Sequence, residues 1–385
     1  MASSDIEKKS WLQRREKKKK WKSRSMSVMK ILEFFGRRNS SQQSAKKNNS
    51  VWIFDNTAYM NEQGTWEAEF TVVIFNQKAA VGVTSAVADF AIGIGLGSGN
   101  ETKAVMQKRL IPCVRSVVPG RIVKIDFGSQ KQIKMSPGSL DCISSDIKSL
   151  PEFKSGTIIT SKARALPESE GLLEMKTLYA GPEGWGVISD IDDTIKLTQT
   201  SDPMGFLHET FVAEPSPIKG MPELFSYIQI LISYPPFFYL SASPYNLYPF
   251  LHTFRQNYFP YGTIALRNIS WIDPSFLLSN FTLGIQTFKI DYMKKIHSWL
   301  PNRKMICIGD STQSDPEVYA ELYRMHPGWI RLILIRKVTD ISSTSIGSRN
   351  ETTRFSKAFK GIPKEDWFVF ESPNECYSIL RNTSL

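Results

Sequence analysis

The chain has 385 residues, of which 41% are hydrophobic and 12% aromatic, and its formal net charge is +11. This length suffices for two domains and a tail, and the apolar content exceeds that of a disordered chain. Four cysteines without a Cys-x-x-Cys pair argue against a disulfide scaffold and structural zinc, and favour a reducing compartment. No apolar run reaches the roughly 18 residues of a membrane span, and no signal-peptide core follows Met1.

The net charge is concentrated in an N-terminal tail, predicted to be disordered over residues 1–50. Residues 1–47 hold 15 Lys/Arg and 4 Asp/Glu, so the rest of the chain is neutral. Two basic clusters, 14–22 and 37–38, flank the apolar stretch 26–35, which is typical of segments that bind anionic membrane surfaces reversibly. A solvated tail without a partner is the alternative. Nucleic acid is disfavoured as a partner because the neutral body offers no basic patch.

Residues 51–180 are predicted to form a β-rich domain. Strand-like runs at 51–54 and 66–75 are separated by a turn, and further short strands follow. The glycine-rich run 93–99 matches neither Gly-x-Gly-x-x-Gly nor a P-loop and is interpreted as a turn. No strong helix is expected here, and nothing in the region identifies a chemistry.

From residue 181 onward, apolar runs of strand length alternate with amphipathic segments of helix length. The strand-length runs are 186–189, 237–240, 263–266, 304–308 and 329–335, and the helix-length segments are 222–232, 246–258 and 289–299. This alternation predicts an α/β domain over 181–385, with a parallel sheet covered by helices on both faces. In such folds, sites form beyond the carboxyl ends of the strands.

The first of these strands ends in the pattern Asp-x-Asp-x-Thr, with carboxylates at Asp190 and Asp192 and a hydroxyl at Thr194. Burying carboxylates beside a hydrophobic strand is costly unless a metal ion or hydrogen-bond donors compensate. The pattern therefore indicates Mg²⁺-assisted phosphoryl transfer, with Asp190 as nucleophile and Asp192 as general acid and base. Turn or cap chemistry is the alternative for this motif taken alone.

Later strand ends and helix starts carry further polar groups. Ser241 follows the second strand, where it either cradles a phosphate or belongs to an ordinary helix cap. Lys289 begins a helix, a position that suggests an anion partner or is plain surface. Asp310 ends the fourth strand and would complete an oxygen-only Mg²⁺ site with Asp190. Asp315 would hold a metal-bound water, orient Lys289 or cap the following helix.

In this order, the four clusters resemble the motifs of the haloacid dehalogenase superfamily of aspartate-dependent phosphatases. The closer match is to phosphatidate phosphatases of the fungal actin-patch protein family, which are related to the lipins. The resemblance covers roughly 180–340 closely and 51–180 loosely, through 51–59. It is carried by GWGVISDIDDTIK at 184–196, GMPEL at 220–224, YLSASPY at 239–245 and GDSTQSDP at 309–316. It implies a haloacid-dehalogenase-like Rossmannoid parallel sheet without a large cap.

The resemblance also implies a role for each site residue. Asp190 would attack the phosphorus and become an aspartyl-phosphate, while Asp192 would protonate the leaving alkoxide and then activate water. Ser241, Lys289 and Thr194 would bind the substrate phosphate, and Thr194 would also support the turn. The cofactor would be Mg²⁺, held by the side chains of Asp190 and Asp310 and the backbone carbonyl of Asp192. Asp315 is added to the metal site as the residue that would hold a metal-bound water.

The chain is therefore predicted to hydrolyse phosphatidate to diacylglycerol and phosphate. The alternatives are a phosphatase for another lipid or lysolipid phosphate, or a non-catalytic phospholipid-binding adaptor. Asp192 favours an enzyme, since a mere binder needs no proton donor. The spacing of the clusters leaves no room for a large cap, so 197–221 is expected to form a small flap beside an open site. In this flap, Met204, Phe206 and Leu207 would touch a membrane or pack onto the body.

We expect the protein to be cytoplasmic and peripheral at membranes. Its partners would be phosphatidate in anionic membranes, contacted through the basic tail, and, by the resemblance, actin-patch or endocytic proteins. Longer family members carry a proline-rich tail resembling a ligand for SH3 domains, and no such stretch follows the phosphatase region here. The basic N-terminal segment is therefore expected to serve as the membrane address.

Overall fold

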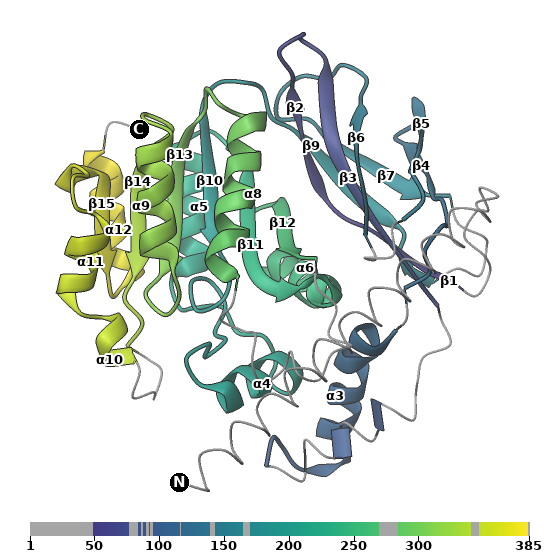
Figure 1. The fold of residues 1–385 in the computed structure, drawn as a ribbon, viewed down its shortest axis with the longest axis horizontal. Helices are drawn as coiled ribbons and strands as arrows, with labels where there is room; N and C mark the ends of the chain where they lie inside the picture. The colour runs from purple at the N-terminus through teal and green to yellow at the C-terminus, as the bar shows by residue number, and fades with distance from the viewer. Residues whose placement is uncertain are drawn as a thin grey trace, which may run out of the picture.

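The computed structural model describes residues 49–76, 84–85, 88–89, 92, 95–115, 117–138, 143–164, 170–268, 284–339 and 346–383. Over these residues the chain forms a six-stranded sheet and a nine-stranded sheet, which lie side by side (Figure 1). The predicted tail lies outside the described residues, except for its last two. Asn49 and Ser50 begin the first strand rather than belonging to the tail.

The six-stranded sheet contains all five strands that the apolar runs predict. Its order is β12-β11-β10-β13-β14-β15, and every neighbouring pair is parallel. The chain passes from β10 to β11 and β12 on one side and then continues with β13 on the other, so the strand order reverses at β10. Ligand sites of open parallel sheets lie at such a reversal. The strands are β10 (Trp185–Asp190), β11 (Phe237–Pro244), β12 (Gly262–Arg267), β13 (Lys304–Asp310), β14 (Ile330–Arg336) and β15 (Trp367–Phe370).

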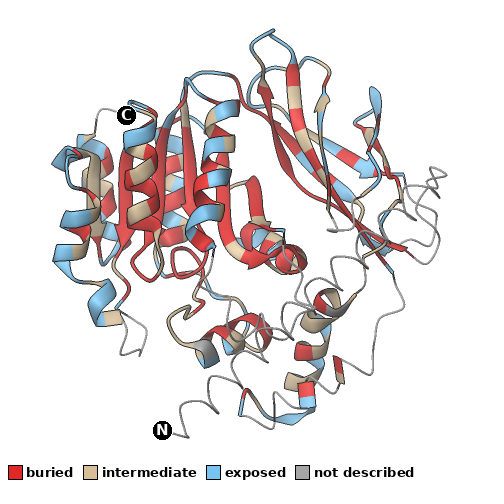
Figure 2. Ribbon diagram, viewed as in Figure 1, coloured by how far each residue is buried: buried red, intermediate tan, exposed pale blue. Residues whose placement is uncertain are grey.

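Helices cover both faces of this sheet, as predicted. Successive residues of a strand point to opposite faces, so Val187 packs in one apolar layer and Ile188 in the other. The strands are consequently buried along nearly their whole length (Figure 2). The layer of Val187 includes α5 (Met221–Leu231), α6 (Tyr248–Tyr258) and α12 (Pro373–Asn382), and that of Ile188 includes α8 (Ile285–Trp299), α9 (Asp315–Met325) and α11 (Thr352–Ala358).

Shorter helices fill the connections of this part of the chain. They are α4 (Pro203–Phe211), η1 (Tyr245–Leu247), α10 (Ile346–Arg349) and η2 (Lys364–Asp366). The predicted elements did not include β15 and α12, which follow the last apolar run. None of the helices in the described ranges has both the length and the hydropathy of a bilayer-spanning segment.

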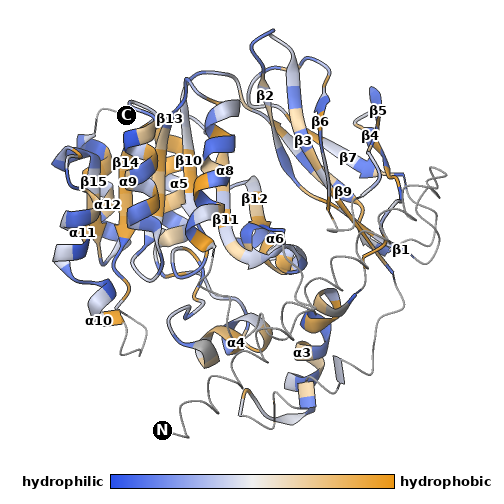
Figure 3. Ribbon diagram, viewed as in Figure 1, coloured by the Kyte–Doolittle hydropathy of each residue, from blue (hydrophilic) through white to orange (hydrophobic). Residues whose placement is uncertain are grey.

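The nine-stranded sheet confirms the prediction of a β-rich region. Its order is β5-β4-β7-β9-β2-β3-β1-β8, with β6 paired to β3, and the β1–β8 and β2–β9 pairs are parallel. Buried and more exposed residues alternate along β7 and the first half of β3, and Figure 3 shows both apolar and polar residues along β3. The strands are β1 (Asn49–Ile53), β2 (Asn56–Met60), β3 (Trp66–Asn76), β4 (Lys124–Phe127), β5 (Lys131–Lys134), β6 (Ile143–Ser149), β7 (Ile158–Ala163), β8 (Glu170–Leu172) and β9 (Glu174–Tyr179).

The prediction that this region holds no strong helix is wrong. Helix α3 (Gly99–Val114) has 16 residues and starts at the end of the glycine-rich run. Its sequence conceals it because Pro112 lies inside the helix and its apolar residues follow no clear helical period. The helix packs against α4 and η1. Such tertiary contacts stabilise a helix whose local propensity is weak.

A buried ion pair joins the two sheets. Asp55, between β1 and β2, accepts a hydrogen bond through Oδ2 from Arg255 Nη2 of α6 at 2.8 Å. The same oxygen lies 3.0 Å from His252 Nε2, and Oδ1 accepts from the Lys176 backbone N at 2.8 Å. Asp55 thereby ties the start of the nine-stranded sheet to a helix of the parallel sheet.

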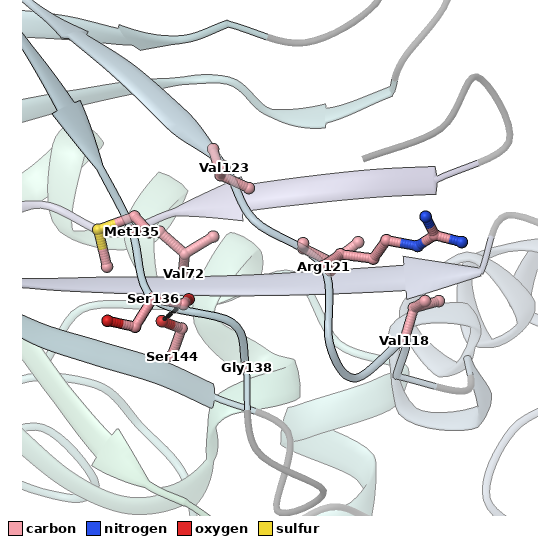
Figure 4. Close-up of a pocket in the computed structure, with 9 residues that line it drawn as sticks. Val72, Val118, Arg121, Val123, Met135, Ser136, Gly138 and Ser144 are labelled. Carbon is pink, nitrogen blue, oxygen red and sulfur yellow. Dashed lines mark hydrogen bonds between the residues drawn. The ribbon is translucent and has the colours of Figure 1, made fainter. Parts of the chain in front are cut away.

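A small cavity lies inside the β-rich part, beside β3 and β6 (Figure 4). Its volume is about 10 Å³, which is room for about one water molecule. Ser144 Oγ donates to the Ser136 carbonyl at 2.8 Å, and the Arg121 side chain extends away from both serines. The cavity is therefore too small to be a substrate site.

Candidate active site

The predicted polar clusters lie together at the carboxyl-terminal edge of the parallel sheet. Asp190 and Asp310 end the neighbouring strands β10 and β13, and Ser241 lies in β11 on the other side of β10. Lys289 lies near the start of α8, and Asp315 is the first residue of α9. Each of these five residues is at most 1% exposed. They converge because parallel strands share one carboxyl edge.

Three carboxylates surround one ammonium group in this site. Asp190, Asp310 and Asp315 each offer an oxygen within 4.8 Å of the others. Lys289 Nζ lies 2.6 Å from Asp190 Oδ1 and forms a second ion pair with Asp315 Oδ1. The buried cluster therefore has more carboxylates than cations, and such a site is stable with a further cation or with added protons.

The pKa values reflect this imbalance. Burial raises the pKa of the Asp190 carboxyl well above its usual value, although Lys289 opposes the shift. Burial, and then the charge of Asp315, raises the pKa of Asp310 to about 7. For Lys289, burial alone would lower the pKa, but the carboxylates of Asp190 and Asp315 outweigh burial and raise it. A cation at the cluster would favour the ionised carboxylates.

Thr194 joins the two strand ends. Its Oγ1 lies 3.1 Å from Asp190 Oδ2 and 3.3 Å from Asp310 Oδ2. Thr194 is fully buried. Its single proton is directed at the carboxylates, so in this geometry it supports the turn that follows β10 and links that turn to the end of β13.

Asp315 has a protein donor on each oxygen. Its Oδ1 pairs with Lys289 Nζ, and its Oδ2 accepts from the Asp310 backbone N at 3.1 Å. Of the roles considered for Asp315, the contacts fit the orientation of Lys289 better than the binding of a metal-bound water. Its side chain makes no cap hydrogen bond to α9.

The Asp192 side chain lies outside the group formed by Asp190, Asp310 and Asp315. Its Oδ1 accepts from Thr198 Oγ1 at 3.1 Å, and its Oδ2 accepts from Ser241 Oγ at 2.5 Å. Ser241, which was expected to bind phosphate, here donates its proton to Asp192. A metal contact from Asp192 would therefore come from its backbone carbonyl, because hydroxyl donors already occupy its carboxylate.

Asp193 fixes the segment that follows the motif. It has a φ of 60°, in the left-handed region that Asp tolerates better than most residues. Its Oδ1 accepts from the backbone N of Thr198 at 2.9 Å and of Gln199 at 2.7 Å, and its Oδ2 accepts from the Thr200 backbone N at 2.7 Å. Thr200 Oγ1 also lies 2.9 Å from Thr312 Oγ1, beside Asp310.

These contacts place residues 198–200 beside the site, and the open site without a large cap stays a prediction. Asp192 is 5% exposed and the other acidic groups of the site less, because residues 198–200 fold back onto Asp193. No motif in the sequence marks Thr198, Thr200 or Arg336. Arg336 Nη1 donates to the Asp193 carbonyl at 2.7 Å. The run of hydroxyl residues directly after the motif is the one sequence feature that pointed to the two threonines.

The predicted flap at 197–221 contains α4. Phe206 is 7% exposed and belongs to the core cluster of the sheet, and Leu207 packs against a cluster on α3. Packing onto the body is therefore the observed arrangement for both. Met204 is 42% exposed.

Comparison with known proteins finds matches to the part of the chain that contains the site. Residues 185–337 match the family model described as the catalytic domain of phosphatidate phosphatase APP1. Phosphatidate phosphatase APP1 of Saccharomyces cerevisiae is 32% identical over 180 residues, which is 45% of this chain and 29% of that protein. An uncharacterized protein of Schizosaccharomyces pombe is 29% identical over 196 residues, 50% of this chain and 31% of that protein.

The chain thus spans less than a third of the length of the curated relatives it matches. The matched segment begins with β10 and ends just after β14, so it contains all the acidic groups of the site as well as Ser241 and Lys289. The resemblance predicted from the motifs is confirmed over this segment, since residues 185–337 are similar to the catalytic domain of phosphatidate phosphatase APP1.

Proposed function

We propose that this chain is a phosphatidate phosphatase that hydrolyses phosphatidate to diacylglycerol and phosphate. The observation that carries the proposal is the buried cluster of Asp190, Asp310, Asp315 and Lys289, inside the segment that matches the APP1 catalytic domain. The substrate is taken from the name of the Saccharomyces relative. An adaptor without activity would keep several buried carboxylates at a cost in stability and with no chemical use for them.

We further assign the parallel sheet to the haloacid-dehalogenase-like fold. The reversal of strand order at β10 and the position of the motif residues at strand ends support this assignment. Between β10 and α5 the chain forms one helix, α4, which agrees with a fold that has no large cap.

The site residues fit Mg²⁺. Magnesium prefers oxygen ligands, and the cluster offers carboxylate oxygens with too few cations to balance them. The side chains of Asp190 and Asp310 and the backbone carbonyl of Asp192 would hold the ion. When bound, Mg²⁺ would neutralise charge on the phosphoryl oxygens.

In the proposed reaction, an Asp190 carboxylate oxygen attacks the phosphorus and forms an aspartyl-phosphate. The phosphorus–oxygen bond to the glycerol breaks, and the leaving oxygen takes a proton from Asp192. Asp192 then accepts a proton from the water that attacks the aspartyl-phosphate, so inorganic phosphate and free Asp190 are released. Thr198 and Ser241 orient Asp192, and Lys289 stabilises the negative charge of the transition state.

Phosphate release from phosphatidate in detergent micelles tests the proposal. The wild type should release phosphate in the presence of Mg²⁺, whereas Asp190→Asn and Asp192→Asn should lose roughly 10³-fold or more in rate. Asp126→Asn, an exposed carboxylate of the β-rich part, is the control and should keep full activity. Equal release from all four proteins, or none from the wild type, would contradict the assignment.

The same assay separates the alternatives. Faster release from lysophosphatidate would favour a lysolipid phosphatase, and binding of phosphatidate vesicles without release would favour an adaptor. Membrane contact through the basic tail, a cytoplasmic location and association with actin patches are further parts of the proposal, supported by the charge of residues 1–47 and by the resemblance. Loss of vesicle cosedimentation on deletion of residues 1–47 is the expected result for the tail.

A further inference from the structure

Helix α3 belongs to the N-terminal part of the chain but packs against α4 of the flap. The two helices lie next to each other beyond the carboxyl-terminal edge of the parallel sheet (Figure 1). Leu96 and Met106 are buried and form an apolar cluster with Leu207 and Val212 of the flap. The flap is therefore held between the core of the parallel sheet and α3.

Arg109 of α3 occupies the C-terminal end of α4. A helix of nine residues is marginal by itself, and the carbonyls of its last turn have no partners within the helix. The Asp202 side chain caps its N-terminus. At the other end, Arg109 Nη1 donates to the Ala213 carbonyl at 2.6 Å and lies 3.4 Å from the Thr210 carbonyl. A cation at this end is also favourable for the helix dipole.

Arg109 also contacts α6, one of the helices that cover the parallel sheet. Its guanidinium lies 4.9 Å from the ring centroid of Phe250 in α6, and its side chain is 12% exposed. Three residues further along α3, the Pro112 carbonyl accepts a hydrogen bond from Asn246 Nδ2 at 2.8 Å. Asn246 lies directly after β11, the strand that carries Ser241. Helix α3 thus holds both the flap and the segment beyond Ser241.

Hydrogen bonds connect α4 to the segment that contacts Asp192 and Asp193. Gln199 Nε2 donates to Glu209 Oε1 of α4 at 3.2 Å. Gln199 is also bound through its backbone N to Asp193, and its neighbour Thr198 donates to Asp192. Met204, an exposed apolar side chain, lies in the first turn of α4, where it can contact the acyl chains of a lipid substrate.

We propose that Arg109 is a positioning residue that holds α4 beside the active site, so that the N-terminal part of the chain completes the lipid-binding side of the catalytic segment. The kinetic consequences rest on the proposed function, whereas the order of α4 does not. Asp190 and Asp310 end β10 and β13, and Asp192 is also held by Ser241 of β11, so these carboxylates keep contacts that do not depend on α4. Loss of Arg109 should therefore weaken the binding of lipid substrate more than it slows the chemical step.

Hydrogen exchange of the full chain tests the structural part. In Arg109→Met, the amides of 204–213 should exchange about tenfold faster than in the wild type, because hydrogen bonds to a charged donor are lost. The amides of α9 should be unchanged. Arg109→Lys, which keeps the charge, should restore part of the protection. Arg164→Met is the matched control, since Arg164 is an arginine of the same part of the chain with a 62% exposed side chain.

Kinetics on phosphatidate micelles and on a small soluble phosphomonoester test the functional part. For Arg109→Met, KM for phosphatidate should rise about tenfold while kcat stays within about twofold, and hydrolysis of the soluble substrate should change less. If Arg109→Met does not fold, Met106→Ala should loosen α4 by removing its apolar contact. Unchanged exchange of 204–213 in a folded variant would overturn the proposal. Faster exchange with no phosphate release by the wild type would overturn the proposed function alone.

Discussion

The two regions of the molecule differ in their buried charged residues. In the parallel sheet and its helices, Asp190, Lys289, Asp310 and Asp315 are each at most 1% exposed. In the described part of the β-rich region, Asp55 is the one buried charged residue. The carboxylates of the parallel sheet face one another and outnumber their ammonium partner. Asp55 instead has a complete set of protein donors, from Arg255, His252 and the backbone.

This difference separates a buried charge used for chemistry from one used for assembly. A fully paired buried charge is satisfied by the fold, and its removal affects the structure. An under-compensated cluster leaves room for a further charged group, such as a cation or a phosphate. The predictions below test whether the two regions differ in this way.

The sharpest comparison uses two lysines of the same helix. Lys289 pairs with Asp190 in the site, while Lys295 pairs with Glu69 of the nine-stranded sheet at 2.5 Å. Lys289→Met should lower kcat for phosphatidate by roughly 10³-fold, because the charge facing the phosphoryl group is lost. Lys295→Met should leave kcat nearly unchanged, because Lys295 pairs with Glu69 and not with a carboxylate of the site. Comparable losses in the two variants would contradict the distinction.

The convergence that this experiment probes was predictable, because apolar runs that end in Asp190 and Asp310 become neighbouring parallel strands. The contacts inside the site were less predictable from the sequence. That Ser241 donates to Asp192, or that Thr200 meets Thr312, depends on rotamers and on residues more than 40 positions apart, which have no signature in a single sequence.

Contacts between the two regions were not predictable at all. Asp55 and Arg255 are separated by 200 residues, and although Asp55 lies in the stretch 51–59 that carries the loose resemblance, nothing there indicates its partner. Helix α3 was missed because Pro112 and the absence of an apolar period conceal it. Packing against α4 supplies stabilising contacts that the sequence of α3 does not provide by itself. The stability of α3 therefore depends on tertiary contacts.

The next largest effect is expected at the junction of the sheets. Asp55→Ala leaves the buried Arg255 without a carboxylate and should lower the free energy of unfolding by about 3 kcal/mol. The measurement is denaturant unfolding, with kcat per folded molecule recorded in parallel. Because Asp55 makes no contact with the site, kcat should stay close to the wild-type value. Asp126→Ala, which removes an exposed carboxylate, is the control and should change stability little. A large fall in kcat for Asp55→Ala would show that the junction also shapes the site.

Mg²⁺ should stabilise the protein more at neutral than at acidic pH. The folded pKa of Asp310 is raised to about 7 by burial and by Asp315, so between pH ~4 and ~7 the folded state keeps a proton that the unfolded state has lost. In this window stability without Mg²⁺ falls as the pH rises. A bound cation replaces the proton, so the rise in Tm on adding Mg²⁺ should be larger near pH ~8 than near pH ~5. Asp310→Asn should reduce the difference, and a rise in Tm that is independent of pH would contradict it.

The smallest effect is expected at the far ends of the helices that carry Lys289 and Asp315. His297 of α8 and His326 after α9 stack with ring centroids 3.7 Å apart. Burial lowers the pKa of both imidazoles, with a further lowering from His326 at His297 and from Lys294 at His326. Their folded pKa values lie below the unfolded value of about 6.5, so the unfolded chain takes up protons first and stability falls as the pH drops through that value. His326→Gln should therefore lose less Tm than the wild type between pH ~7.5 and ~5.5, while kcat at neutral pH stays unchanged because the pair is remote from the site. Equal losses of Tm in both proteins would show that the pair does not contribute to the acid sensitivity of the fold.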